Sequence, residues 1–148
     1  MKFKKWILSV AVVASVFGAS QSAFAISGLA DDYASAVPFA LNHELVTFIA
    51  KSDSDWYTYQ NNTSSTQFVV LSALAYQYNP SLNVDLEVYL KSPNNSGLVY
   101  LGTAADSGPG LADVYTRNLL PGETIVWVVN GHNPESDIGI YRTSVVGV

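Results

Sequence analysis

The stretch that decides the fold class reads Val84-Asp85-Leu86-Glu87-Val88-Tyr89-Leu90. Apolar residues occupy every second position, and more polar residues stand between them. Because successive side chains of a strand point to opposite faces, this alternation predicts a β-strand with one face on a core and one face toward water. No stretch of the chain after residue 25 keeps a 3.6-residue period long enough to predict a helix.

Seven other stretches have the composition of short strands and are separated by residues that favour turns. Together the predicted strands cover residues 45–50, 55–60, 66–74, 84–90, 98–101, 111–117, 124–130 and 138–146. The breaks contain pairs such as Asn79-Pro80 and Pro121-Gly122, whose backbone preferences suit tight turns. The sequence therefore predicts one all-β domain, an antiparallel β-sandwich of about eight strands.

The first 25 residues have the three parts of a secretory signal peptide. Lys2, Lys4 and Lys5 precede an apolar run, which is followed by the A-x-A cleavage pattern Ala23-Phe24-Ala25. The run is shorter than the roughly 20 residues that cross a bilayer, which argues against a membrane anchor. We predict cleavage after Ala25, a secreted, extracellular protein, and a single mature domain of residues 26–148 in which residues 26–36 form a leader.

The composition disfavours several classes of partner and chemistry. The net charge is −5, and removal of the three N-terminal lysines changes it to −8. The four cations that remain are scattered, so they offer no surface for nucleic acid or for anionic membranes. The chain has no cysteine, which excludes disulfides, a thiolate nucleophile and a thiolate metal site.

Several motifs, taken in order along the chain, resemble the bacterial pre-peptidase C-terminal domain. The segment Ser52-Asp53-Ser54-Asp55-Trp56-Tyr57-Thr58-Tyr59 resembles its D-x-D-W/Y-Y-x-F/Y strand. The shorter matches are Asp31-Asp32 with Ala34 to Leu41, Asn83 to Tyr89, Leu120-Pro121-Gly122-Glu123-Thr124, and Tyr141-Arg142-Thr143-Ser144-Val145. The resemblance spans nearly all of residues 30–146. It implies a jelly-roll-like β-sandwich of the kind that secreted peptidases carry as a targeting, substrate-binding or maturation module.

The resemblance also implies a metal site. The similar collagen-binding domains of clostridial collagenases bind calcium near the leader and the D-x-D segment, which here corresponds to Asp31, Asp32, Asp53 and Asp55. Calcium prefers such carboxylate oxygens. The alternative is that Asp53 caps the turn before its strand and that Asp31 and Asp32 are solvated leader residues.

Residues 124–130 are apolar on both faces and form the candidate contact surface. If the family register applies, Val126 and Val128 point inward. The surface would then consist of Ile125, Trp127, Val129 and, on a neighbouring strand, Tyr89. Exposed apolar patches often mark binding sites. The alternative is that the chain itself covers both faces of this strand.

The residues give little support for catalysis. The sequence has no G-x-S-x-G elbow and no H-E-x-x-H zinc pattern, and His43 and His132 stand in polar, turn-like contexts typical of surface histidines. Asp53 and Asp55 share one strand face, and their spacing alone does not exclude a glycosidase pair. The sequence shows no apolar pocket around a general acid, however.

We therefore interpret the protein as a secreted, non-catalytic binding or accessory domain that engages an extracellular polymer or protein through one sheet face. Two alternatives remain open, namely a small carboxylate-dependent hydrolase and a structural or assembly protein of the cell surface, matrix or spore. A pocket lined by carboxylates would favour the hydrolase, a flat aromatic sheet face would favour binding, and an uncovered edge strand would favour assembly.

Overall fold

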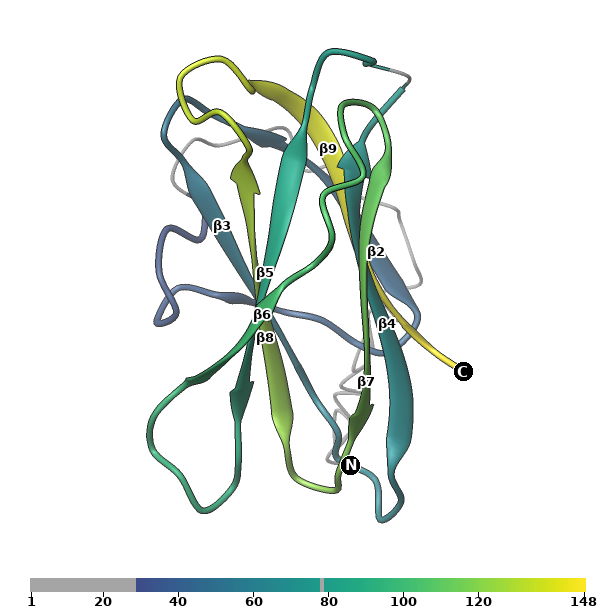
Figure 1. Cartoon of the computed structure of the whole chain (residues 1–148). Coiled ribbons are helices and arrows are strands. Elements are labelled where there is room, and N and C mark those ends of the chain that lie inside the picture. Colours follow the sequence, from purple (N-terminus) through teal and green to yellow (C-terminus); the bar gives the residue numbers. More distant parts are fainter. Residues whose placement is uncertain (1–28, 78) are drawn as a thin grey trace, which may run out of the picture.

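The structure, a computed structural model, describes residues 29–77 and 79–148. These residues form two β-sheets packed face to face, with no α-helix among them (Figure 1). None of the described residues forms a helix long and apolar enough to cross a membrane. The predicted signal peptide and the first residues of the predicted leader lie outside the described residues.

The described chain contains nine strands. They are β1 (Val37–Pro38), β2 (His43–Ile49), β3 (Ser54–Gln60), β4 (Gln67–Ala75), β5 (Val84–Lys91), β6 (Val99–Thr103), β7 (Ala112–Leu119), β8 (Thr124–Gly131) and β9 (Gly139–Gly147). The all-β sandwich is confirmed, and strands β2 to β9 correspond to the eight predicted strands. β1 was not predicted, and it pairs with β3 in parallel, with Val37 opposite Tyr57.

The strands divide between a five-stranded and a four-stranded sheet. The five-stranded sheet has the order β1-β3-β8-β5-β6, and the four-stranded sheet has the order β2-β9-β4-β7. Every pairing other than that of β1 is antiparallel. The chain crosses between the sheets several times, for example from β6 to β7 (Figure 1). Segments distant in sequence therefore meet at the ends of the sandwich.

The core lies between the two sheets and is built by the alternation seen in the sequence. Val84, Leu86, Val88 and Leu90 of β5 are all buried in it, as predicted. The four-stranded sheet contributes residues of β4 and β9, such as Leu71 and Tyr141. Two inner faces of apolar side chains packed in this way supply most of the stabilising free energy of a β-sandwich.

The turn before β8 has the backbone that its sequence requires. Gly122 adopts a φ of 79°, and the Glu123 amide donates to the Leu120 carbonyl oxygen at 3.1 Å. Proline followed by a residue with positive φ is typical of a type II turn. The turn is held from the side by Asn61, whose carbonyl oxygen accepts from the Gly122 amide at 2.8 Å.

The described part of the leader folds back onto the five-stranded sheet, at the start of β3 (Figure 1). The Trp56 amide donates to the Ala30 carbonyl oxygen at 2.9 Å, and Ala30 is fully buried. The chain then runs through β1 before it enters the four-stranded sheet at β2.

Candidate functional site

The contact surface predicted around Trp127 is wrong, because Trp127 points into the core. Its side chain is 0% exposed, its indole N–H donates to the Thr143 hydroxyl at 2.9 Å, and Ile125 and Val129 on the same face are also fully buried. The register explains the error, since Trp127 lies opposite the core residue Val88 of β5. Three of the four predicted ligand contacts are therefore core residues.

Tyr89, the fourth of them, lies on the outer face of the five-stranded sheet. Directly opposite it on β8 is Val126, which together with Val128 forms the outward side of that strand. Both valines are nevertheless buried, which means that neighbouring side chains cover them. The covering residues define a different candidate surface.

Three aromatic side chains form a row across this outer face. Trp56 of β3 stacks on Tyr89 of β5 with ring centroids 5.6 Å apart, and Tyr89 lies 5.2 Å from Tyr100 of β6. The row spans four neighbouring strands, because β8 lies between β3 and β5. We call Trp56, Tyr89 and Tyr100 the aromatic row. Tyr100, at its open end, is 55% exposed.

Hydrogen bonds fix the rings of the row in place. The Tyr89 hydroxyl donates to Glu87 Oε2 at 2.9 Å, and the Asn130 amide donates to the other Glu87 oxygen at 3.2 Å. The hydroxyls of Tyr100 and Thr103 lie 2.7 Å apart. Burial, together with the Glu87 carboxylate, raises the pKa of Tyr89 to about 12, so its hydroxyl stays a donor at neutral pH.

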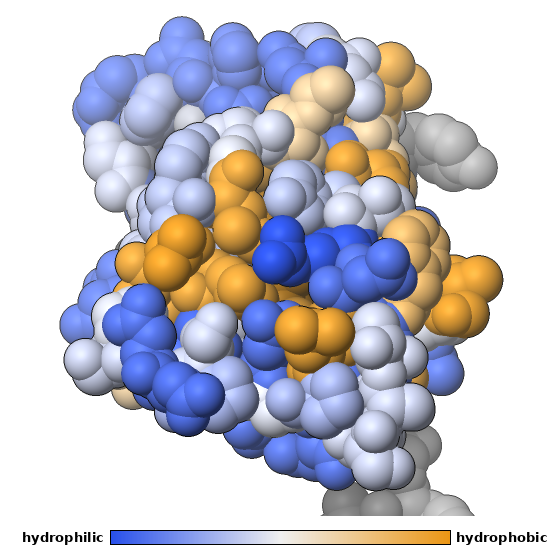
Figure 2. Space-filling view, turned by 60° about the horizontal axis from the view of Figure 1, so that its bottom comes forward, coloured by the Kyte–Doolittle hydropathy of each residue, from blue (hydrophilic) through white to orange (hydrophobic). Residues whose placement is uncertain are grey.

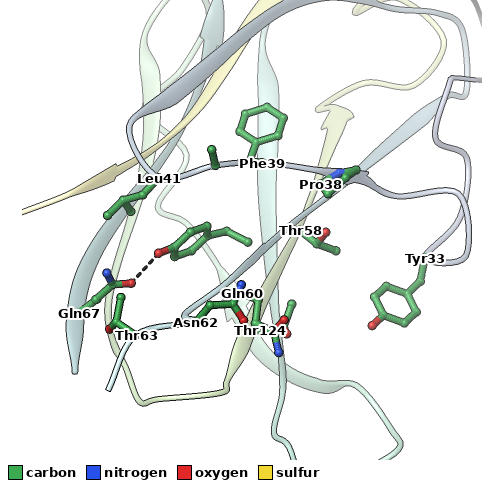
Figure 3. Close-up of a pocket in the computed structure, with 12 residues that line it drawn as sticks. Tyr33, Pro38, Phe39, Leu41, Thr58, Gln60, Asn62, Thr63, Gln67 and Thr124 are labelled. Atoms are coloured by element: carbon green, nitrogen blue, oxygen red, sulfur yellow. Dashed lines mark hydrogen bonds between the residues drawn. The ribbon is translucent and has the colours of Figure 1, made fainter. Parts of the chain in front are cut away.

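A pocket of about 590 Å³ lies beside the strand β3, at the edge of the same sheet (Figure 3). Tyr33 and Leu41 lie at opposite ends of it, and polar side chains such as Thr58 and Gln60 lie between them (Figure 3). The Lys91 ammonium lies 5.4 Å from the Tyr33 ring centroid. Since Thr58 and Trp56 occupy one face of β3, the pocket continues the surface of the aromatic row.

The end of the sandwich at the bottom of Figure 1 is turned forward in Figure 2. Several hydrophobic residues lie together at the left of this view, and hydrophilic residues border them. Other hydrophobic residues lie apart from this group, which is normal for a protein surface.

The four aspartates of the predicted calcium site come near one another but do not share one point. Both oxygens of Asp53 accept backbone N–H groups, from Ala50 at 3.3 Å and from Ser54 at 3.0 Å. Asp32 Oδ1 accepts from the amide and the hydroxyl of Ser35, each at 2.8 Å. These contacts are the turn-capping arrangement that the sequence left as the alternative. Within the described residues, no three of these carboxylates have ligand atoms within 4.8 Å of one another.

Asp55 has a structural partner. The Tyr141 hydroxyl donates to Asp55 Oδ2 at 2.5 Å, and it also contacts the Tyr57 hydroxyl inside the sandwich. Burial raises the pKa of Asp55 to about 6; the Tyr141 hydrogen bond opposes this rise, and the charges of Asp53 and Asp31 add to it. The carboxyl therefore joins β3 of one sheet to β9 of the other.

The structure also brings together three ligating side chains that the sequence did not connect. Asp85, Asp106 and His132 each place one ligand atom within 4.8 Å of the other two. His132 is exposed, as expected, but its ring contacts both carboxylates. The three residues lie far apart in the sequence, so no short spacing pattern could have revealed the group.

Comparisons with known proteins identify solved structures with a similar fold. No protein-family model and no curated protein matches the sequence. Among solved structures, the pre-peptidase C-terminal domain of a collagenase from Bacillus anthracis is similar, with a TM-score of 0.51 and 21% identity over 74% of this chain and 93% of that chain. The fold is that of a pre-peptidase C-terminal domain.

A second similar solved structure is the mitogen derived from Yersinia pseudotuberculosis. It has a TM-score of 0.52 and 11% identity, over 73% of this chain and 86% of that chain. In this chain the D-x-D-W-Y segment and the closing strand meet between the two sheets, where Tyr141 donates to Asp55. The resemblance inferred from the motifs is confirmed at the level of the fold.

Proposed function

We propose that the protein is an exported, non-catalytic binding module that engages an extracellular polymer or secreted protein through the outer face of its five-stranded sheet. The observation that carries the proposal is the aromatic row of Trp56, Tyr89 and Tyr100. Aromatic side chains offer a large apolar contact area at low entropic cost, and they are enriched among the residues that dominate binding.

The shape of the surface suits an extended ligand. The row crosses the sheet from β3 to β6, and the pocket beside β3 adds hydroxyl and amide groups of Thr58, Gln60 and Thr124. A flat strip of rings flanked by hydrogen-bonding groups can contact successive units of a polypeptide or polysaccharide chain. A small molecule would instead favour an enclosed cavity.

The fold and the N-terminal sequence support the same assignment. A domain of this fold belongs to a Bacillus anthracis collagenase, and collagen is an extracellular polymer. The signal-peptide pattern of residues 1–25 supports export. Neither observation names the ligand, so the proposal rests on the chemistry of the aromatic row.

The two alternative functions have weaker support. Two pockets of the described residues, of about 590 and 410 Å³, are lined by no aspartate or glutamate, which gives no support to a carboxylate-dependent hydrolase. For an assembly role, β7 is an eight-residue edge strand with Val114 47% exposed. Open edge strands can pair between molecules, so the oligomeric state is measured together with binding.

The test is co-sedimentation of the purified protein with insoluble collagen, cellulose, chitin and peptidoglycan, and pull-down of secreted proteins. We expect at least one of these to capture the protein. Replacing Trp56 or Tyr100 by alanine should weaken that binding about 30-fold or more, since loss of an aromatic anchor that dominates binding costs about 2 kcal/mol or more.

The matched control is Phe68→Ala, which removes a partly exposed aromatic residue from the four-stranded sheet. This variant should bind as the unmodified protein does. Equal binding by Trp56→Ala, Tyr100→Ala and the unmodified protein would overturn the proposed surface. Capture of none of the polymers or secreted proteins would overturn the proposed function.

A further inference from the structure

A second cluster of ligating groups lies at the end of the sandwich where β5 begins and β8 ends. Asp85 is on β5, His132 follows β8, and Asp106 lies in the segment that crosses from β6 to β7. His132 Nδ1 lies 3.1 and 3.2 Å from the two Asp85 carboxylate oxygens and 3.6 Å from Asp106 Oδ2. The geometry brings one nitrogen and two carboxylates to a common point.

Two buried oxygens beside this cluster have no hydrogen-bond partner in the described part of the chain. They are Asn83 Oδ1 and Asp113 Oδ2, and their residues are only 6% and 1% exposed. A buried polar atom without a partner normally costs about 1–3 kcal/mol, so its presence calls for an explanation such as an ion.

Both residues are anchored beside the cluster. The side-chain Nδ2 of Asn83 donates to Asp106 Oδ1 at 3.2 Å. Asp113 Oδ1 accepts from the backbone N–H of Ser107, the neighbour of Asp106, at 2.9 Å. In each case one polar atom of the side chain is held beside Asp106 and the other remains free. These two unpartnered buried oxygens are a second observation, beside the three-residue group of Asp85, Asp106 and His132.

The charges of the cluster are unbalanced without a cation. Three carboxylates, those of Asp85, Asp106 and Asp113, share one imidazole. A bound divalent cation would offset the repulsion between these carboxylates.

We propose that Asp85, Asp106 and His132, supported by Asn83 and Asp113, form a binding site for a divalent transition-metal ion, with zinc as the first candidate. Imidazole nitrogen suits zinc, and carboxylate oxygen is also a zinc ligand. Zinc binds these atoms at about 2.0–2.2 Å, so tetrahedral ligand atoms lie about 3–4 Å apart. The cluster needs only a small contraction to reach that geometry.

On binding, the zinc ion would take the lone pair of His132 Nδ1, and a proton held on that nitrogen would be released to solvent. The ion would then tie β5, the crossing segment and the chain after β8 to one another. Its role would be to stabilise this end of the sandwich, which is independent of the aromatic row and of the proposed binding function.

The test is isothermal titration of the purified, untagged protein with zinc chloride after EDTA has been removed, with thermal melting as a second readout. We expect saturable binding of one zinc ion per chain and a higher melting temperature. His132→Gln and Asp106→Asn should each weaken zinc binding about 10–100-fold or more. Both side chains are about half exposed, so these variants are expected to fold, and circular dichroism checks this.

The control is His43→Gln, because His43 is an exposed histidine that lies outside the cluster. It should leave zinc affinity unchanged. Three results would overturn the proposal: no zinc binding up to millimolar concentration, zinc affinity unaffected by His132→Gln, or a calcium affinity that exceeds the zinc affinity and is lost in His132→Gln. The first of these would leave His132 as an ion-pair partner of Asp85 and nothing more.

Discussion

Trp127 and Trp56 lie on opposite faces of the five-stranded sheet, and this difference decides what each side chain contributes. Trp127 packs against Phe39 and Tyr57, with ring centroids 5.2 and 5.6 Å away, and its N–H group is satisfied by Thr143. Trp56 stacks on Tyr89 at the surface. The first residue therefore stabilises the fold, and the second is available to a ligand.

Replacing Trp127 by alanine should lower the free energy of unfolding by about 3–5 kcal/mol, because it empties a large volume in the core. Trp56→Ala should cost much less, since that ring is only partly buried. The denaturant midpoint of each variant measures this difference. If Trp127→Ala left the midpoint unchanged while Trp56→Ala lowered it strongly, the face assignment of β8 would be incorrect.

The sequence could not settle the faces of β8, because both are apolar and a shift of one residue exchanges them. The signal that favours the observed face is at the ends of the strand. Thr124 and Asn130 share a face with Val126 and Val128, and these polar ends mark the outer side. Because the central residues of the strand are apolar on both faces, the sequence pattern drew attention away from these polar ends.

Asp55 predicts a pH dependence of stability. Its pKa is about 6 in the folded protein and near 3.8 in the unfolded chain, so the folded state holds this proton more tightly. Asp55 therefore adds stability below about pH 4, and this contribution is lost as the pH rises through about 6. The full difference is about 3 kcal/mol.

The measurement compares the unfolding free energy of the unmodified protein and of Asp55→Asn between pH 4 and 7, in EDTA. The difference between their two pH profiles isolates Asp55 from the other carboxylates. In Tyr141→Phe, which lacks the hydrogen bond that lowers the pKa of Asp55, the loss should move to higher pH. Parallel profiles for the unmodified protein and Asp55→Asn would contradict the prediction.

At the scale of elements, the strands that alternate cleanly and the turns with proline and glycine were predictable. β5 and the Pro121-Gly122 turn are examples, because local sequence alone determines their conformation. β1 was not predictable, since two residues carry no periodicity and its parallel partner β3 lies about 20 positions away. The cluster of Asp85, Asp106 and His132 was also not predictable. Its residues are distant in the sequence, and they meet only because the chain crosses between the two sheets.

The turn before β8 depends on the glycine at position 122. A Cβ atom there would lie 2.9 Å from Pro93 Cγ, and the φ of 79° is unfavourable for other residues. We expect Gly122→Ala to cost about 1–3 kcal/mol of stability. Gly97→Ala is the matched control, because its Cβ would meet only Asn95 Oδ1, at 3.6 Å. Equal melting temperatures for the two variants would show that the turn is not strained.

At the scale of the whole molecule, the predicted signal peptide would determine where the domain acts. We predict that the mature protein begins at Ile26, because Ala23 and Ala25 are the small residues that signal peptidase requires. Intact-mass spectrometry of the protein from the culture medium measures this. Retention of residues 1–25 in the secreted protein, or a start well beyond Asp31, would contradict the predicted cleavage.

The leader and the start of β3 form the part of the molecule on which calcium would act. The Ala30 carbonyl oxygen already accepts from the Trp56 amide, so the aspartates that follow Ala30 are held near Asp53 and Asp55. The charges of Asp31 and Asp53 both act on Asp55. A cation would relieve this repulsion if the turn of Asp31 and Asp32 moved closer to β3.

We therefore expect millimolar calcium to raise the melting temperature of the protein and EDTA to lower it, because a ligand of the folded state stabilises that state by mass action. Magnesium should act more weakly, since it demands stricter octahedral geometry. Asp55→Asn should reduce the calcium effect, whereas Asp85→Asn, at the separate zinc cluster, should retain it. A melting temperature that does not change well above millimolar calcium would leave Asp53 and Asp32 as turn caps, which is the role their present hydrogen bonds describe.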